Sequence, residues 1–421
     1  MGLLDIMVPV YVVLLTVLDA TPFGFMYSNL FLLPVFALFV FRLAKGDERL
    51  AFTPIVILFG LTIIGQLVPI LLGVAVNLDL APAAVAQASR LLVLLLFLSS
   101  YFTDEDRIRR ALYACTVGFM VNYIWGHWIL HNELSGRATA LFVNPNGAGL
   151  LAVSTLFGIR ILFDLAGSRP ARWQRVYLAL VSVSALHLIL ASQSRKSLLV
   201  VILAIAWEAL NHFRKARYKL PIAGLFLSIA FGASTLLLLM PENTVMRRFN
   251  NAYRTFTDPT VVSNEEDRGV LIRLEFYRTA LGIIAEHPIL GQGAGAFRTL
   301  SNERSNQITE GRVTHSTFLD MFIEGGLLSV ISYLGIFFVL ALAFWKRRGQ
   351  SETYLLLFLF VLLAGGLELG AWRYMDKHKW LIFTLLFYIG REGLLRLDHS
   401  KNALPSKEIL PATAVSPAHH T

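Results

Sequence analysis

The stretch AVAQASRLLVLLLFL, residues 84–98, lies inside an apolar run that extends from residue 80 to residue 101. A helix that crosses a bilayer needs about 20 predominantly apolar residues, so this run is long enough to be a transmembrane span. The whole chain has the same character, because 56% of its 421 residues are hydrophobic and 12% are aromatic. Such a composition excludes an ordinary soluble domain and indicates a polytopic membrane protein.

Comparable apolar runs recur along the chain and predict an all-α fold with about twelve transmembrane helices. They lie near residues 6–20, 23–41, 51–73, 80–101, 108–130, 147–165, 176–192, 197–212, 220–240, 315–344, 354–371 and 379–395. The first lacks the basic start of a cleaved signal peptide, so we expect it to be retained. Residues 1–240 would hold nine spans, residues 315–396 three, and residues 397–421 a polar, disordered, cytoplasmic tail.

The distribution of lysine and arginine predicts the orientation, because basic residues in short loops stay on the cytoplasmic side. With the N-terminus inside, the cytoplasmic connections hold 16 basic residues and the short external ones hold six. The six are Arg137, Arg195, Lys196, Arg373, Lys377 and Lys379. Both termini are therefore expected in the cytoplasm, and the net charge of +9 reflects this bias rather than nucleic-acid binding.

One connection, residues 241–314, is much longer than the others and falls on the external side, where extramembrane chemistry can take place. It holds nine arginines, nine acidic residues and no lysine. Guanidinium groups bind two phosphate oxygens at once, so the arginines favour a phosphate site. The equal number of acids favours instead ion pairs within the loop. Residues 268–288 predict an amphipathic helix ended by Pro288, on which Arg273 and Arg278 point about 140° apart. At most one of these two arginines can therefore face a given pocket.

Other polar residues lie at or inside the external ends of spans. Arg90 is about ten residues inside a span, at a depth where a charge usually faces a cavity or a partner. Arg195, in ASQSRKSLLV, either extends to lipid headgroups or binds phosphate. In LFVNPNGAGLLA, residues 141–152, Asn144 and Asn146 either form a turn and cap a helix or bind carbohydrate or phosphate.

The glycine-rich segment GQGAGAF, residues 291–297, resembles a phosphate-binding loop only superficially, because no strand precedes it. We expect it to be a turn whose backbone passes close to its neighbours. In RVTHSTFLDMFIEGG, residues 312–326, His315 stands where a polar segment meets an apolar one. It can anchor the interface, stabilise the fold or transfer a proton. His127 and His131 are rival histidines at another external end, and His287 is expected at a helix terminus.

Four motifs together resemble the O-antigen ligase and polymerase superfamily of bacterial inner-membrane proteins, over residues 140–370. They are SQSRKS, R-x-x-x-x-x-x-A-L, HPILGQGAGAF and HSTFLDMFIEGGLLS. The resemblance implies a glycan donor linked to undecaprenyl diphosphate and chemistry on the periplasmic side. It places the signature histidine on His315 and the motif arginines on Arg195 and Arg273. Two positions depart from the usual pattern, since Ser316 replaces a frequent asparagine and Lys196 a frequent glycine.

These residue types fit a metal-independent transfer without a cofactor. A lipid diphosphate leaves without an acid if cations neutralise its charge, so we expect Arg195, Arg273 and the deeper Arg90 to bind it. A neutral imidazole can remove the proton of an acceptor hydroxyl, which makes His315 the expected general base. Asn144 and Asn146 are the candidate glycan ligands.

A divalent metal would need grouped carboxylates. The external candidates are Glu265, Glu266 and Asp267, three adjacent acids that are typical of a solvated loop, and the lone Asp19.

Three functions remain open. The leading hypothesis is a ligase that transfers O-antigen to the lipid A-core oligosaccharide at the inner membrane. The alternatives are a polymerase or protein O-oligosaccharyltransferase of the same superfamily, and a transporter of lipid-linked glycans. The long external loop with a motif histidine favours an enzyme over a transporter. The expected partners are the lipid-linked donor, the lipid A-core and membrane lipids.

Overall fold

The computed structural model describes residues 2–18, 24–79, 81–134, 137–142, 145–166, 171–215, 265–304, 314–367 and 377–394. These residues form 13 α-helices, one short π-helix and a two-stranded hairpin, β1 (Glu133–Leu134) with β2 (Arg137–Ala138). The hairpin pairs Glu133 with Ala138 and Leu134 with Arg137 in antiparallel register. Within the described residues, the predicted all-α class is therefore confirmed.

Eleven of the twelve predicted spans coincide with helices. These are α1 (Leu3–Leu18), α2 (Gly24–Ala44), α3 (Pro54–Leu71), α4 (Ala81–Tyr101), α5 (Glu105–Tyr123), α6 (Pro145–Leu165), α7 (Arg172–Ser192), α8 (Arg195–Lys215), α13 (Thr317–Arg347), α14 (Glu352–Leu367) and α15 (Lys377–Glu392). Among the described residues, α3, α4, α6, α7 and α13 are long and apolar enough to cross a membrane. The span predicted at 220–240 and the tail at 397–421 lie outside the described residues, so the number twelve stays a prediction.

Local sequence explains where several helices begin. Thr53 caps α3, because its hydroxyl accepts a hydrogen bond from the Val56 amide at 3.4 Å, and Pro54 occupies the first helical turn. Asp104 caps α5 in the same way, accepting from the Arg107 amide at 2.9 Å. The bounds of these helices therefore follow from the capping residues that precede them.

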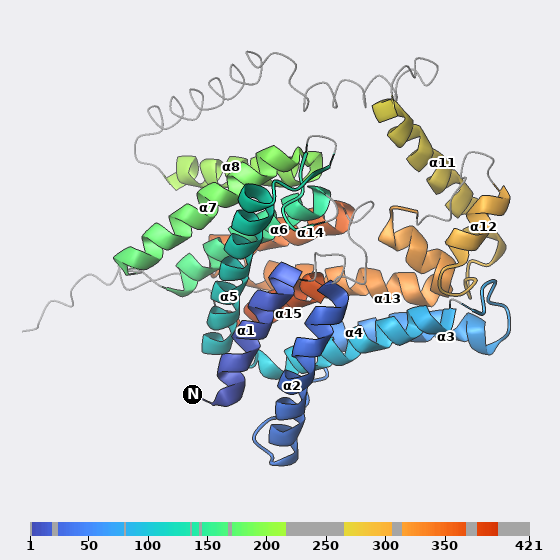
Figure 1. Cartoon of the computed structure of the whole chain (residues 1–421), viewed down its shortest axis with the longest axis horizontal. Helices are drawn as coiled ribbons and strands as arrows, with labels where there is room; N and C mark the ends of the chain where they lie inside the picture. Colours follow the sequence, from blue (N-terminus) through green and yellow to red (C-terminus); the bar gives the residue numbers. More distant parts are fainter. Residues whose placement is uncertain are drawn as a thin grey trace, which may run out of the picture.

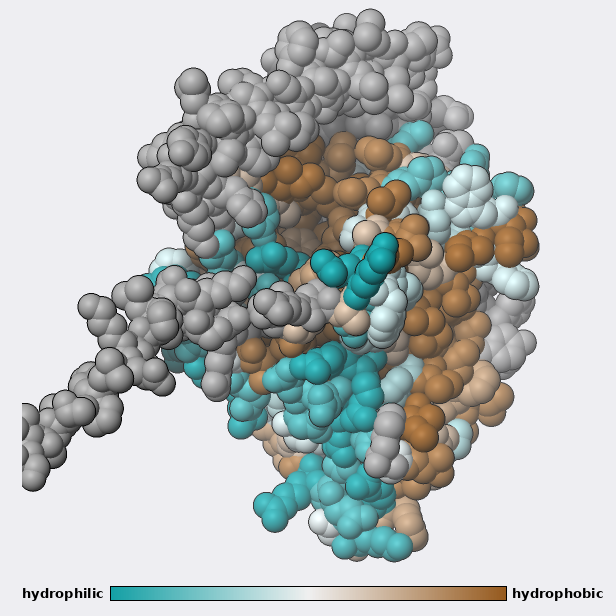
Figure 2. Space-filling view, turned by 90° about the vertical axis from the view of Figure 1, so that its left-hand side faces the viewer, coloured by the Kyte–Doolittle hydropathy of each residue, from teal (hydrophilic) through white to brown (hydrophobic). Residues whose placement is uncertain are grey.

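An ion-pair network lies at the end of the molecule that the basic residues predict to be cytoplasmic. The guanidinium of Arg107 on α5 lies 3.1 Å from the carboxylate of Asp5 on α1 and 2.7 Å from that of Glu48, which follows α2. Figure 2 shows hydrophilic residues gathered on the face that is the left-hand side of Figure 1, beside a hydrophobic flank. The network joins three segments at their polar ends.

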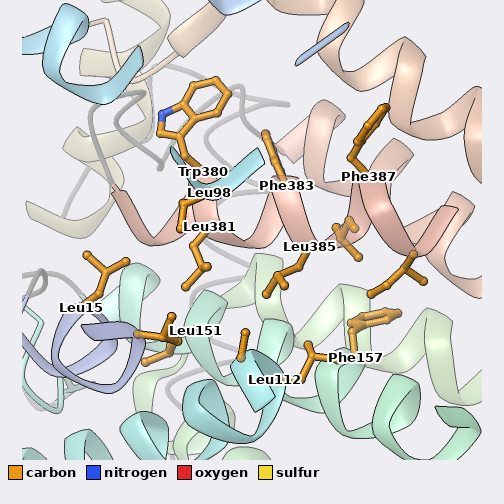
Figure 3. Packing of buried hydrophobic residues seen from close by; sticks show 14 of the residues in the cluster. Leu15, Leu98, Leu112, Leu151, Phe157, Trp380, Leu381, Phe383, Leu385 and Phe387 are labelled. Atoms are coloured by element: carbon orange, nitrogen blue, oxygen red, sulfur yellow. The ribbon is translucent and has the colours of Figure 1, made fainter. Parts of the chain in front are cut away.

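The core between the helices is apolar and aromatic. One cluster of buried side chains extends from α1 to α15, and Figure 3 shows side chains of α15 packed against those of α4, α5 and α6. The labelled members are Leu15, Leu98, Leu112, Leu151, Phe157, Trp380, Leu381, Phe383, Leu385 and Phe387. Between membrane helices such contacts stabilise mainly through close packing, because lipid tails are as apolar as leucine.

Two lysines that the orientation analysis assigned to an external connection lie instead in the first turn of α15. Lys377 and Lys379 have exposed fractions of only 2% and 0%. The Lys377 ammonium donates to the Ser28 hydroxyl at 2.5 Å, and that of Lys379 donates to the Tyr333 hydroxyl. These contacts explain how the charges can be buried, since each ammonium group has hydroxyl acceptors from another helix.

α13 packs along α3, and the two lie side by side in Figure 1. The span predicted over 315–344 coincides with α13, and Gly325 and Gly326 interrupt this helix because their backbone angles are non-helical. A glycine pair is a common cause of such kinks. The loop helix predicted over 268–288 is present as α11 (Glu265–Glu286). With α12 (Ala296–Arg304), it lies at the right of Figure 1, beyond the ends of α3 and α13.

Candidate functional site

His315 lies in the turn that precedes α13, with its backbone in the left-handed region at φ 60°. The hydroxyl of Thr314 holds this turn by donating to the Ser316 carbonyl at 2.8 Å and accepting from the Ser316 amide at 3.0 Å. The carboxylate of Asp320 accepts from the Thr314 amide at 3.1 Å. Ser316 also caps α13 by accepting from the Leu319 amide. The turn leaves His315 exposed while both of its neighbours are buried.

The ring of His315 lies over the ring of Phe276 on α11, with centroids 5.8 Å apart and planes 23° apart. Arg273 precedes Phe276 by three residues, so the two share one face of α11, and Arg273 is exposed. Tyr277 lies near the charged side chains of Arg273 on α11 and Asp320 on α13. Burial raises the pKa of its phenol, whereas the charge of Arg273 lowers that pKa and the charge of Asp320 raises it. The structure therefore brings Arg273 and His315 onto two adjoining elements.

Two glycine motifs dock on one another beside this pair. The break in α13 frees backbone carbonyls that an unbroken helix would occupy, and the glycine loop, residues 291–297, binds them. The Gln292 amide donates to the Ile323 carbonyl at 2.7 Å, and the Gly293 amide donates to the Glu324 carbonyl at 2.9 Å. This confirms the prediction that the loop's backbone passes close to its neighbours. The docking of the loop also provides hydrogen bonds to the freed carbonyl groups of α13, which could not be left unpaired at membrane depth.

The carboxylate of Glu324 fastens the glycine loop to α3. One oxygen accepts from the Gly295 amide at 2.9 Å, and the other accepts from the Gln66 side-chain amide at 2.8 Å. A second contact joins α11 to α12, where the Arg304 guanidinium donates to the Glu286 carboxylate at 2.7 Å and holds the pKa of that carboxyl below its usual range. These bonds fix α11 relative to the start of α13.

Arg195 begins α8 after a tight turn, residues 192–197, which we call the arginine turn. Gln193 reverses the chain with a left-handed backbone at φ 49°, and the hydroxyls of Ser194 and Ser197 are 2.9 Å apart. Gly149 of α6 packs into this turn so closely that a Cβ there would lie 2.6 Å from Ser197 Oγ and 2.8 Å from Ser194 Cβ. The side chain of Arg195 lies outside the described residues.

The same packing brings two sequence motifs together. Asn146 is in the first turn of α6, one turn before Gly149, so the described part of the NPNGAG segment, residues 145–149, adjoins the arginine turn. Asn144 lies outside the described residues. Asn146 therefore stays a candidate glycan ligand with a defined place in the fold.

Residues 178–334 match the family described as O-antigen ligase. This match supports the resemblance to the O-antigen ligase superfamily over this region. The match begins within α7 and ends within α13, so it contains Arg195, Arg273 and His315. It is narrower than the 140–370 of the sequence resemblance. No curated protein matches the chain.

Arg90 lies outside the region that matches O-antigen ligase and has a different environment. It is exposed on α4, next to the buried Leu91, so it points away from the helix core. The structure does not bring it together with His315 or with the arginine turn through any contact among the described residues. Its role at the diphosphate stays a prediction.

The rival histidines lie elsewhere. His127 is in the π-helix η1 (Ile124–Ile129) that continues α5, His131 follows η1, and His287 is exposed just after α11. Among the residues that the structure describes, no group of three or more His, Cys, Asp or Glu side chains is placed to hold a metal. The side chains of the four acids considered for a metal, at 19 and 265–267, lie outside that part of the chain.

Sequence reasoning missed the residues that support the site. Phe276 packs on His315, Asp320 holds the turn before α13, Tyr277 lies near Arg273 and Asp320, and Glu324 binds the glycine loop. Two signals were present in the sequence. An acid at 324 within an apolar run is costly unless it has a partner, and the glycine pair that follows it is typical of a break in a helix.

Proposed function

We propose that the protein transfers O-antigen polysaccharide from undecaprenyl diphosphate to lipid A-core oligosaccharide on the periplasmic side of the bacterial inner membrane. The observation that carries this proposal is the pairing of His315 with α11. Its exposed ring rests on Phe276, one helical turn from the exposed Arg273, inside the matched region. An exposed imidazole packed against the helix that carries an exposed arginine suits group transfer from a diphosphate.

In the proposed reaction, the imidazole of His315 takes the proton of an acceptor hydroxyl. The hydroxyl oxygen then forms a bond to the anomeric carbon of the donor while the bond from that carbon to the diphosphate oxygen breaks. The diphosphate leaves with one additional negative charge, and no proton has to be supplied to it. The turn built by Thr314 and Asp320 supports the base role, because it fixes the backbone on both sides of His315 while that residue stays exposed.

Arginines in this proposal stabilise the negative charge that builds on the leaving diphosphate. Arg273 comes from α11 and Arg195 from the arginine turn, with Arg90 as a deeper candidate on α4. Guanidinium groups bind phosphate oxygens in pairs, which orients the donor as well as neutralising it. Convergence of Arg195 and Arg273 on one diphosphate is part of the proposal.

A reconstitution assay tests the function. Purified protein in vesicles would receive the lipid-diphosphate glycan with lipid A-core, with additional donor alone, or with a protein acceptor. Growth of the lipid A-core supports the ligase. Growth of the donor chain identifies a polymerase, glycosylation of the protein identifies an O-oligosaccharyltransferase, and movement of the donor across the bilayer without a new bond identifies a transporter.

A further inference from the structure

A cluster of aromatic and imidazole rings lies at the end of α5, outside the site described above. It consists of Tyr123, His127 and Trp128, with His187 from α7. The Tyr123 hydroxyl and Nδ1 of His187 are 2.9 Å apart, and the His127 and His187 centroids are 5.2 Å apart. We call these four residues the ring cluster.

A π-helix makes the cluster. α5 changes at Ile124 into η1, and the ring of Trp128 meets that of Tyr123 five residues earlier, a spacing that matches the wider turn of a π-helix. π-helical segments are rare and occur frequently at functional sites. Packing of α5 against its neighbours does not by itself require a π-helical turn, so the turn points to a role beyond packing.

Trp128 presents a fixed aromatic surface. Its indole is stacked on the His187 ring with centroids 5.8 Å apart and planes 20° apart, yet the residue remains 54% exposed. The rings of Tyr123 and His127 meet the indole edge-on, with ring centroids 6.3 Å and 5.3 Å from it. A tryptophan that only anchors a protein at the membrane interface needs no such support. Here three rings hold the indole in one orientation.

The ring cluster is continuous with the arginine turn. The chain after the hairpin is pinned to the segments on either side of η1, since the Leu141 amide donates to the Asn122 side chain of α5 at 3.2 Å and the side chain of Asn132, which follows η1, donates to the Ala140 carbonyl at 2.9 Å. That segment leads into α6, whose Gly149 packs on the arginine turn. α7 also connects the two places, because it carries His187 and ends at the turn.

We infer that the ring cluster binds a hexopyranose ring of a glycan substrate, with the free face of Trp128 against the apolar face of the sugar. An indole surface beside imidazole and phenol groups supplies what a sugar needs, which is a flat apolar contact next to hydrogen-bonding groups. The inference rests on the proposed glycan transfer for its biological meaning. Binding itself can be measured without transfer.

The test measures binding of two soluble probes to the purified full-length protein by saturation-transfer NMR and tryptophan fluorescence. One probe is core oligosaccharide freed from lipid A, and the other is O-antigen polysaccharide freed from its carrier, so the two sources of a hexose are distinguished. Trp128→Ala should weaken binding of at least one probe about tenfold, and Trp128→Phe should retain most of it.

Trp173→Ala is the matched control, because Trp173 is 66% exposed on the first turn of the same α7 that carries His187, at its other end. It should bind both probes like the unchanged protein. Equal losses in the Trp128 and Trp173 variants, or no binding of either probe, would overturn the inference. The inference would also be overturned if Trp128→Ala changed the interaction with glycan-free vesicles but left the binding of both probes unchanged. That result would assign Trp128 to membrane anchoring. His315→Ala protein should still bind, which separates this inference from the proposed chemistry.

Discussion

The surroundings of the arginine turn and of His315 are built in different ways. The arginine turn joins two consecutive helices, and the hydroxyls that shape it belong to residues three apart in the chain. The turn at His315 also has local hydrogen bonds, but the surroundings of the His315 ring depend on contacts across long stretches of sequence, since the ring packs on Phe276 of α11 and the nearby Glu324 is tied to Gln66 on α3. A local turn forms with its helices, whereas the His315 environment forms only when α3, α11 and α13 have docked. Substitutions should therefore affect the two regions differently.

The largest effect is expected at the proposed base. His315→Ala should lower transfer about 10²- to 10⁴-fold while the protein folds and still binds donor, because only the proton acceptor is lost. Turnover in the reconstituted assay and donor binding would be measured together. His287→Ala is the control, since His287 is exposed beyond α11 and should give the original rate. Substantial turnover in folded His315→Ala protein would remove this residue from the base role.

A second prediction tests whether the two regions act on one diphosphate. Arg195→Lys and Arg273→Lys should each reduce turnover by about 10²-fold with a smaller change in donor affinity, because lysine keeps the charge but loses the paired donors. Arg278→Lys is the control on the same helix, since Arg278 is 87% exposed and pairs with Glu275. A near-normal rate for Arg195→Lys would contradict a shared clamp.

The third prediction concerns the docking of the glycine motifs. Gly326 has φ 61°, and a Cβ there would lie 2.1 Å from the backbone carbonyl oxygen of Ile289. Gly326→Ala should therefore lower the free energy of unfolding by about 2–4 kcal/mol, measured by thermal unfolding in detergent. In Gly282→Ala, the new methyl meets nothing within 4 Å, and helix propensity should make this control neutral or slightly stabilising.

The same substitution at Gly149 of α6, which packs against the arginine turn, should cost less. A methyl on Gly149 meets serine side chains rather than backbone, and its helical backbone accepts alanine. Overpacking opposes the gain in helix propensity, so Gly149→Ala should destabilise by about 0–2 kcal/mol. If Gly149→Ala proves as costly as Gly326→Ala, the contrast between a local and a docked region is wrong.

The smallest effect is expected from chelation. If arginines supply all the positive charge at the diphosphate in both regions, EDTA should leave the transfer rate within about twofold of its original value. Activity lost in chelator and restored by Mg²⁺ or Mn²⁺ would show that a metal, rather than the arginines, carries this role.

Sequence motifs selected candidate residues that the structure places close together in the fold. His315 and Arg273 were identified from motifs, and both now lie on adjoining elements. Asp320 and Tyr277 were not, because an acid and a phenol on amphipathic helices are common, and their significance comes from contacts made across the turn. The exposure of Arg90 was equally unpredictable, since sequence places it at a depth in a span but leaves open which side of the helix bundle it faces.

The sequence by itself determined the helical class, the positions of the described apolar helices and the loop helix after residue 264. Length, apolarity and capping residues act locally, and in lipid the backbone has to satisfy its own hydrogen bonds within each segment. Tertiary structure alone decided which groups pair with the backbone freed at Gly325 and Gly326, the docking of the glycine loop and the burial of Lys377 and Lys379. In each case a backbone or ammonium group is stabilised by a partner from another segment, and that partner is set by packing rather than by neighbouring sequence.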